Sequence, residues 1–249
     1  MADELNGKVA IVTGAGRGIG AAIAAGYARA GATVVCVSRT SAEVESVASA
    51  IEDQGGKAFA IAADVADPAA VDRLLNATVE RAGGLDILML NHGVSLDWNN
   101  VERSNVADWM TTFDVNLHGA YHCARLAIPH LKRRGGGNLI MMGSGQGHHG
   151  SPGVAAYACS KAALWMLVRV LADELRSDGI NVNEILPGGV RTTLDRYRPR
   201  TPVAVPAATR PAGDRIREPE EIVPLAVFLA AQPPTGPTGQ SFSLRRETL

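Results

Sequence analysis

The residues most suited to chemistry are a tyrosine and a lysine one helical turn apart, Tyr157 and Lys161, with Ser144 in the loop before them. Side chains at positions i and i+4 share one face of a helix, so the phenol and the ammonium can converge on one point. A nearby positive charge favours phenolate and therefore lowers the pKa of a phenol. A tyrosine in this setting can serve as a general acid or base near neutral pH. The alternative is that the two side chains merely share a helix.

A glycine-rich turn lies near the N-terminus. The apolar run Val9–Val12 leads directly into Thr13-Gly14-Ala15-Gly16-Arg17-Gly18-Ile19-Gly20, and a helix is expected to follow. Glycines allow the backbone to turn sharply and to approach a pyrophosphate, which binds at the helix N-terminus where N–H groups point outward. A turn of this kind in the first strand–helix connection predicts a dinucleotide site.

The end of the second expected strand carries Ser38-Arg39. An Asp or Glu there would bind the ribose 2′-hydroxyl of NAD. A guanidinium can instead bind a phosphate with two hydrogen bonds, and Arg17 could add a second positive charge. The pattern predicts NADP (NADPH) as the cofactor, with NAD as the less favoured choice; alternatively, Arg39 is an ordinary solvated side chain. Asp64-Val65 and Asn91-His92-Gly93 follow later strands and should lie at the same, ligand-binding edge.

Bulk composition limits the class of protein. The chain has 249 residues, a mass of 26.0 kDa and a formal net charge of −1, which fits one domain over residues 1–249 and indicates neither nucleic acid nor an anionic membrane as partner. The acidic start lacks the apolar segment of a signal peptide, and no apolar run approaches the ~18 residues of a membrane span. Cys36, Cys123 and Cys159 are expected to be small buried hydrophobes, and a cytoplasmic location is expected.

Elements that could position these residues alternate along the chain. Short β-branched runs predict buried parallel strands at Val9–Val12, Thr33–Val37, Ala58–Ala62, Ile87–Leu90, Leu139–Met142 and Val182–Leu186, with a short last strand at Ser241–Leu244. Helical spacing predicts helices at Gly18–Ala30, Ala42–Gln54, Ala69–Ala82, Val106–Arg133 and Val154–Ser177, and another from Pro219 to about Ala231. Repeated strand–helix–strand units predict an α/β fold with a single doubly wound parallel sheet (Rossmann fold) and helices on both faces.

Two segments depart from this alternation. The expected helix Val154–Leu175 is apolar almost all round, so we expect one side to pack on the sheet and the other on a second subunit. The stretch Thr192–Glu218 has no clean periodicity and carries four prolines and six arginines. It is interpreted as a substrate lid whose arginines could select acidic substrates; the alternative is a solvated loop.

The chain resembles the short-chain dehydrogenase/reductase family from about Leu5 to Gln240. The resemblance rests on motifs in the family's order: Thr13–Gly20, Asp64, Asn116 in Val115-Asn116-Leu117, Ser144 thirteen residues before Tyr157, Tyr157-x-x-x-Lys161, and Pro187-Gly188-Gly189-Val190-Arg191-Thr192. Two places depart from the pattern. His92 replaces the usual alanine of Asn-Asn-Ala-Gly and is expected to be a packing change, and Leu244-Arg245-Arg246-Glu247 replaces the usual Asp-Gly-Gly, which puts the packing of the tail in doubt.

The resemblance implies a role for each residue. Ser144 would donate a hydrogen bond to the substrate carbonyl oxygen, Tyr157 would deliver the proton, and Lys161 would lower the pKa of Tyr157 and bind the nicotinamide ribose. Asn116 would hold a water that links Lys161 to solvent. The cofactor would be held by Gly14, Gly16, Arg17, Gly18, Ile19, Gly20, Ser38, Arg39, Asp64, Val65, Asn91, Gly93, Tyr157, Lys161, Pro187, Gly188, Val190 and Thr192. His148-His149 lacks partners at metal-ligand spacing, so no metal is expected and the pair should line a loop.

The sequence therefore predicts an NADP(H)-dependent oxidoreductase that interconverts a ketone and a secondary alcohol, acting as a reductase on a small carbonyl or alcohol substrate. The resemblance also implies a homotetramer. An NAD-dependent alcohol dehydrogenase of the same family remains an alternative, as do a non-catalytic NADP-binding regulatory protein and a lyase or dehalogenase that works without a nicotinamide.

Overall fold

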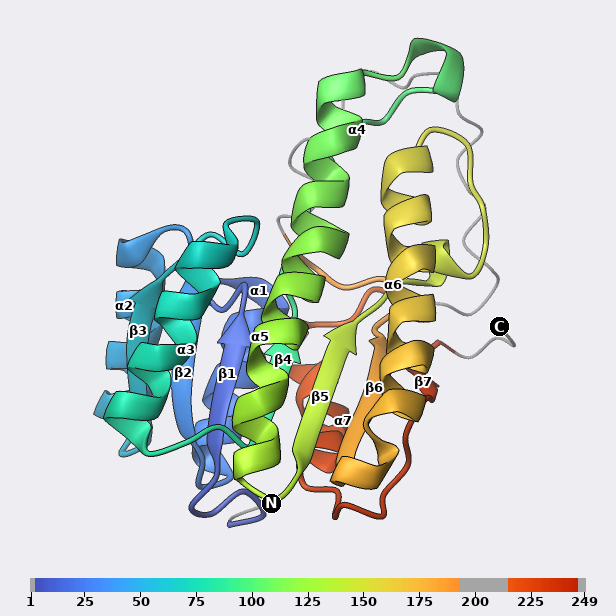
Figure 1. Ribbon diagram of the computed structural model, residues 1–249. Coiled ribbons are helices and arrows are strands. Elements are labelled where there is room, and N and C mark those ends of the chain that lie inside the picture. Colours follow the sequence, from blue (N-terminus) through green and yellow to red (C-terminus); the bar gives the residue numbers. More distant parts are fainter. Residues whose placement is uncertain (1–2, 193–214, 246–249) are drawn as a thin grey trace.

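The computed structural model describes residues 3–192 and 215–245, and within these ranges one parallel sheet forms the centre of the molecule (Figure 1). Its strand order is β3-β2-β1-β4-β5-β6-β7. The strands are β1 Val9–Thr13, β2 Thr33–Ser38, β3 Lys57–Ala62, β4 Ile87–Leu90, β5 Gly137–Met142, β6 Ile180–Leu186 and β7 Ser241–Ser243. The predicted fold class is confirmed, and the structure begins several strands one or two residues earlier than the apolar runs suggested.

Helices cover both faces of this sheet. They are α1 Gly18–Arg29, α2 Ser41–Asp53, α3 Pro68–Ala82, α4 Val106–Phe113, α5 Gly119–Arg133, α6 Ala155–Glu174 and α7 Val223–Ala230. One buried cluster joins α1, α2 and α7 to the sheet, and a second joins α3, α5 and α6 to the opposite face. In Figure 1, α4 and the loop before it project beyond the sheet edge.

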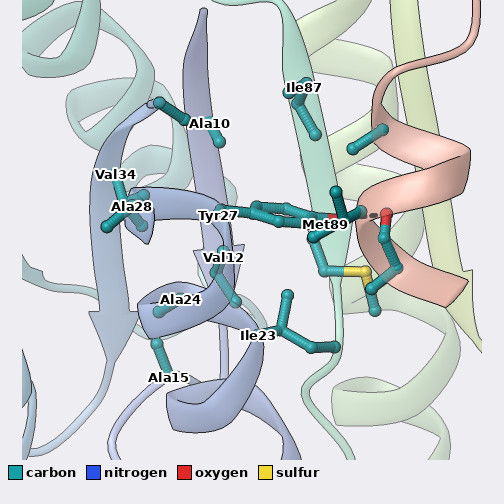
Figure 2. Packing of buried hydrophobic residues seen from close by; sticks show 14 of the residues in the cluster. Ala10, Val12, Ala15, Ile23, Ala24, Tyr27, Ala28, Val34, Ile87 and Met89 are labelled. Atoms are coloured by element: carbon teal, nitrogen blue, oxygen red, sulfur yellow. Dashed lines mark hydrogen bonds between the residues drawn. The ribbon is translucent and has the colours of Figure 1, made fainter. Parts of the chain in front are cut away.

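Strand residues alternate between these two cores, as a side-chain period of two requires. Ala10 and Val12 of β1 belong to the first cluster, whereas Ile11 between them belongs to the second. Figure 2 shows the first core, where the fully buried Tyr27 of α1 lies among apolar side chains. Its hydroxyl donates a hydrogen bond to the carbonyl oxygen of Ala226 in α7 at 3.2 Å, so the phenol is satisfied inside the core.

Local sequence explains the helix boundaries. The side chain of Asp67 accepts a hydrogen bond from the backbone N–H of Ala69 at 2.9 Å, and Pro68 occupies the first turn of α3. Pro tolerates this place because its missing N–H would have no partner within the helix. Gly83 ends α3 with φ 81°, a left-handed conformation that glycine adopts without a steric penalty.

The long helix predicted over Val106–Arg133 is interrupted. Between α4 and α5, residues Asp114–His118 form a π-helical turn, which accommodates an extra residue in the helix. Val115 and Asn116 of this turn are buried. The interruption was not predictable from apolar spacing, because the chain remains helical on both sides of it.

α6 has the length and mean hydropathy of a membrane span, although 39% of its 18-residue window is buried inside the fold. Its inward face, which includes Leu164 and Val168, belongs to the second core cluster. Packing against the sheet therefore accounts for the apolar side chains of the inward face, whereas Met166 and Val170 remain exposed.

Two further expectations concern the burial of the cysteines and the predicted lid. Cys36 and Cys123 are buried as expected, but Cys159 is exposed, because it lies on the outward face of α6. The expectation that Cys159 is buried was therefore wrong. Most of the predicted lid Thr192–Glu218, with most of its arginines, lies outside the described residues.

Candidate active site

The carboxyl ends of the parallel strands border a cavity of about 750 Å³. β1 and β4 are neighbours in the sheet although they are not consecutive in the chain, and this reversal of strand order is where open α/β sheets bind ligands. The predicted site residues that line the cavity are Gly14, Gly16, Arg17, Gly18, Ile19, Ser38, Arg39, Asp64, Val65, Asn91, Gly93, Ser144, Tyr157, Lys161, Pro187, Gly188, Val190 and Thr192. Gly20 and Asn116 are not among the residues that line the cavity.

The glycine turn joins β1 to α1. Gly14 and Gly18 have φ values of 64° and 55°, in the left-handed region that favours glycine. A Cβ at Gly20 would overlap the carbonyl oxygen of Gly14, so the third glycine allows the helix to pack against the turn. The residue before α1, Arg17, does not cap the helix with its side chain, and the first-turn N–H groups are available to a phosphate. This bare backbone cradle fits a dinucleotide pyrophosphate.

Thr13 and Asn91 connect this turn to the end of β4. The Asn91 Nδ2 donates to the carbonyl oxygens of Thr13 and Gly14, both at 3.3 Å. The Thr13 hydroxyl lies 2.7 Å from His92 Nδ1. Burial, and then the charge of Lys161, lowers the pKa of His92 to about 3, so its imidazole is neutral. His92 thus links the two loops, and it also lines the cavity.

Charged side chains line the cavity beside the glycine turn. Arg17 Nη1 forms an ion pair with Glu43 Oε1 at 2.7 Å, and Arg39 lines the cavity beside them. A Cβ at Gly16 would lie 2.7 Å from Glu43 Oε2 and 3.3 Å from Ser38 Oγ, so both side chains converge on this turn. Sequence reasoning missed Glu43; the only available signal was an acidic residue in the first turn of α2.

Asp64 and Val65 follow β3 in the chain. Asp64 Oδ1 accepts a hydrogen bond from the backbone N–H of Ala66 at 3.0 Å, which holds the carboxylate in a local turn. Val65 packs against α5, where a Cβ at Gly119 would lie 2.7 Å from Val65 Cγ2. Both residues line the cavity.

Ser144, Tyr157 and Lys161 line the same cavity. Ser144 follows β5, and its Oγ accepts a hydrogen bond from the backbone N–H of Gln146 at 3.2 Å. Lys161 is buried, and its Nζ lies 5.9 Å from the centre of the Tyr157 ring. The ammonium donates to the carbonyl oxygen of Met142 at 2.8 Å. Burial lowers the pKa of Lys161 to about 8, so this side chain can exchange its proton close to neutral pH.

Asn116 lies in the π-helical turn, with both ends of its amide engaged. Its Oδ1 accepts from Val94 N at 2.8 Å, and its Nδ2 donates to Val94 O at 2.9 Å and to Ser160 Oγ at 3.0 Å. A Cβ at Gly93 would lie 3.4 Å from Asn116 Oδ1 and 3.5 Å from Lys161 Nζ, so the amide and the ammonium lie on the same side of Gly93. These contacts tie α6 and the loop after β4 to one residue.

The segment after β6 borders the cavity. Gly188 has φ 73°, and beyond it the backbone N–H of Arg217 donates to Gly189 O at 2.8 Å. Arg217 is largely buried and also donates to the carbonyl oxygen of Leu244. A Cβ at Gly18 would lie 3.5 Å from Thr192 Cγ2, so this segment reaches back to the glycine turn.

Within the described residues, no three His, Cys, Asp or Glu side chains gather as metal ligands would. His148 lies in the loop after Ser144 and is not among the residues that line the cavity. Its Nε2 instead lies 3.1 Å from the buried carboxylate of Glu184, a contact that the sequence did not indicate.

Known proteins are similar to most of this chain in sequence and in fold. Residues 8–202 match the family model described as short chain dehydrogenase. The chain is 38% identical to an NADPH-dependent aldehyde reductase-like protein of Arabidopsis thaliana, over 91% of this chain and 88% of that protein. It is 33% identical to a 3-oxoacyl-[acyl-carrier-protein] reductase of Synechocystis, over 96% of both chains.

A crystal structure of a short-chain type dehydrogenase/reductase from Mycobacterium marinum matches the fold with a TM-score of 0.82 and 32% identity, covering 96% of this chain and 94% of that chain. The family model and these relatives cover nearly the whole sheet and every motif around the cavity. The chain therefore belongs to the short-chain dehydrogenase/reductase family.

Proposed function

We propose that the protein is an NADP(H)-dependent oxidoreductase that interconverts a ketone and a secondary alcohol, and that it acts mainly as a reductase. One observation carries the proposal: Ser144, Tyr157 and Lys161 line the same cavity as the glycine turn, Arg17 and Arg39. A cofactor in this cavity would reach from the arginines to the tyrosine.

The side chains have distinct roles in the proposed reaction. When bound, the nicotinamide supplies the hydride or accepts it. The Ser144 hydroxyl donates a hydrogen bond to the substrate oxygen, where negative charge develops during reduction. Tyr157 gives its phenolic proton to that oxygen, and in the reverse direction it removes the proton from the alcohol. The Lys161 ammonium stabilises the phenolate that remains.

Proton supply follows from the surroundings of Lys161. Its pKa of about 8 allows the ammonium to exchange a proton near neutral pH. Asn116 is tied to Val94 and Ser160 rather than to Lys161 directly. A water held near Gly93 could therefore connect the two, and we assign Asn116 to that relay.

The proposed preference for NADP rests on charge. The end of β2 offers Ser38 and Arg39 in place of a carboxylate, and Arg17 lies nearby. A 2′-phosphate could form charge-assisted hydrogen bonds with both guanidinium groups. One relative carries "NADPH-dependent" in its name, which supports this choice. Glu43 opposes it, because its carboxylate pairs with Arg17 and lies on the same turn.

Arg39→Asp is expected to reverse the cofactor preference. Loss of a charge-assisted contact costs about 1.5–3 kcal/mol, so NADPH should lose roughly ten- to a hundredfold in affinity while NADH gains relative to it. Dissociation constants from quenching of protein fluorescence check this directly. Arg176→Asp, on an exposed arginine before β6, is the matched charge control. Equal affinities of the unaltered protein for both cofactors would contradict the assignment.

Glu43→Gln is expected to tighten NADPH binding and to leave NADH binding nearly unchanged. The change frees Arg17 from its ion pair and removes a negative charge near the proposed phosphate, an effect of about 1 kcal/mol or on the order of fivefold at a solvated site. Glu45→Gln on the same helix is the control, since Glu45 instead accepts from Ser41. If Glu43→Gln weakens NADH binding, Glu43 holds the ribose hydroxyls, and the NAD-dependent alternative gains support.

The direct test of function titrates NADP(H) and NAD(H) and then screens ketones and alcohols by the absorbance of the reduced nicotinamide. A non-catalytic regulator would bind the cofactor and turn over none of them. A lyase or dehalogenase would bind neither cofactor, although the intact glycine turn argues against it.

We also propose that residues 1–249 form one domain, that 192–218 is its substrate lid, that the protein is cytoplasmic, and that it assembles as a homotetramer. Large apolar side chains remain exposed on four helices of the single chain, namely Val106 and Met110 of α4, Tyr121 of α5, Met166 and Val170 of α6, and Phe228 of α7. Burial of such side chains in subunit interfaces would account for them. Light scattering at micromolar concentration should give about four times 26.0 kDa; a single-chain mass would rule the assembly out.

A further inference from the structure

Glu184 is a carboxylic acid in the centre of the buried strand β6. Its side chain has no exposed surface, and the adjacent strand residues Asn183 and Ile185 are buried as well. Removing a carboxylate from water is costly unless partners replace the lost hydration. The position of Glu184 therefore needs an explanation that the packing of the sheet does not supply.

Two partners come from other elements and hold the same carboxylate oxygen. The Ser241 hydroxyl of β7 donates to Glu184 Oε2 at 2.6 Å, and His148 Nε2 lies 3.1 Å from that atom. The His148 ring lies 5.0 Å from the ring of Trp165 on α6. Glu184 thus connects β7 and the loop after Ser144 to β6.

The other carboxylate oxygen lies against the backbone that leads to Ser144. A Cβ at Gly143 would overlap Glu184 Oε1, so only glycine allows this approach. Within the described residues, this buried oxygen has no hydrogen-bond partner. Its negative charge can act on neighbouring groups through space, because the low dielectric of the interior strengthens such interactions.

Lys161 approaches the same stretch of backbone. Its Nζ donates to the carbonyl oxygen of Met142, the residue directly before Gly143. The Glu184 carboxylate raises the pKa of Lys161 against the stronger lowering effect of burial. Burial raises the pKa of Glu184, whereas Ser241, His148 and the Lys161 ammonium each lower it. The two charges therefore stabilise each other.

Several other titratable or charged groups lie near Glu184 and Lys161. His148 faces Glu184 from the loop after Ser144, and Tyr157 faces Lys161 from the same helix. His92, from the loop after β4, is neutral because its pKa is lowered to about 3. Arg245 lies over Gly145, where a Cβ would be 2.6 Å from its Nη1. The negative charge near Lys161 comes from Glu184.

We propose that Glu184, held by His148 and Ser241, is a positioning residue for proton transfer, and that its carboxylate keeps Lys161 charged while Lys161 acts on Tyr157. The role of Glu184 in proton transfer rests on the proposed function. The electrostatic coupling itself can be measured without turnover.

The test follows the lysines directly by NMR of protein labelled with ¹³C at lysine Cε. The chain carries Lys8, Lys57, Lys132 and Lys161, so the spectrum is simple and Lys161→Arg assigns the signal. Glu184→Gln keeps the shape and removes the charge, and we expect the Lys161 midpoint to fall by roughly one pH unit or more. Lys8, Lys57 and Lys132 should not move. An unchanged Lys161 midpoint would overturn the proposal.

Ser241→Ala is the matched control, because it removes a hydrogen bond to the same carboxylate and preserves the charge. Its Lys161 midpoint should move much less than that of Glu184→Gln. Equal shifts in the two variants would mean that hydrogen bonding in the strand, and not the charge, determines the state of Lys161, and the proposal would be wrong.

If Glu184→Gln does not fold, the reciprocal experiment on Lys161→Met decides the question. Coupling between two sites is mutual, so loss of the ammonium should raise the pKa of Glu184. Infrared spectra recorded across a pH titration, with ¹³C-labelled glutamate to separate Glu from Asp, should then show the protonated buried carboxyl persisting to higher pH than in the unaltered protein. An unchanged titration midpoint of this carboxyl in Lys161→Met would contradict the coupling.

Activity measurements separate this inference from the proposed function. If turnover exists, the alkaline limb of the kcat profile should move to lower pH in Glu184→Gln by the amount seen for Lys161, while the Kd for NADPH changes little. If the variant turns over substrate but neither the alkaline limb of its kcat profile nor the Lys161 midpoint shifts, the inference is refuted and the proposed function stands. A shifted Lys161 in a protein that turns over no carbonyl or alcohol would refute the function and leave the coupling intact.

Discussion

Tyr157→Phe is expected to abolish turnover while cofactor binding stays nearly intact. The phenyl ring keeps the shape that lines the cavity and loses only the hydroxyl to which the proposed mechanism assigns the proton transfer. General acid catalysis alone contributes ~10²–10⁴-fold, so kcat should fall by at least that range. Steady-state kinetics with the best carbonyl substrate, together with the Kd for NADPH, provide the measurement.

Tyr121→Phe is the matched control, because Tyr121 lies exposed on α5 away from the cavity. It should leave kcat unchanged. Near-native turnover in Tyr157→Phe would remove the tyrosine from the mechanism, and the reaction would then need another proton donor. Loss of NADPH binding in the same variant would mean that the phenol supports the site and not the chemistry.

Ser144→Ala should lower kcat by about 10²–10³-fold, the usual effect of losing one donor to a developing oxyanion. The Kd for NADPH should hold, because the proposed mechanism assigns the hydroxyl to the substrate and not to the cofactor. The Ser144 Oγ also accepts a hydrogen bond from Gln146 N at 3.2 Å, so the loop could shift in the variant. Thermal unfolding of both proteins checks for that effect.

Ser151→Ala, in the same connection between β5 and α6 but outside the cavity wall, serves as the control for Ser144. Ser144→Thr keeps the hydroxyl and should recover part of the rate. A Ser144→Ala protein with unchanged kcat and raised KM would show that the serine binds substrate equally in the ground state and the transition state.

The sequence alone was sufficient for the features that depend on neighbours along the chain. The alternation of apolar runs and helical stretches predicted the doubly wound sheet, because the period of side-chain burial is local to each element. The glycine turn was equally readable, since Gly14 and Gly18 adopt backbone conformations that other residues rarely do. The pairing of Tyr157 with Lys161 could be predicted from the sequence because side chains four residues apart share one face of a helix. The catalytic roles and the choice of NADP remain predictions from those patterns.

Tertiary structure decided the contacts between residues far apart in the sequence. Glu43 meets Arg17 across 26 positions, and His148 meets Glu184 across 36. Such pairs depend on strand order, on register and on how each helix is rotated against the sheet, and no local pattern records these. The π-helical turn at Asn116 is similar, because it adds a residue to a helix whose apolar spacing looks continuous. The charge balance in the cavity follows from these long-range contacts. The sequence motifs contain Lys161 and Arg17, but only the folded chain places Glu184 near Lys161 and Glu43 near Arg17.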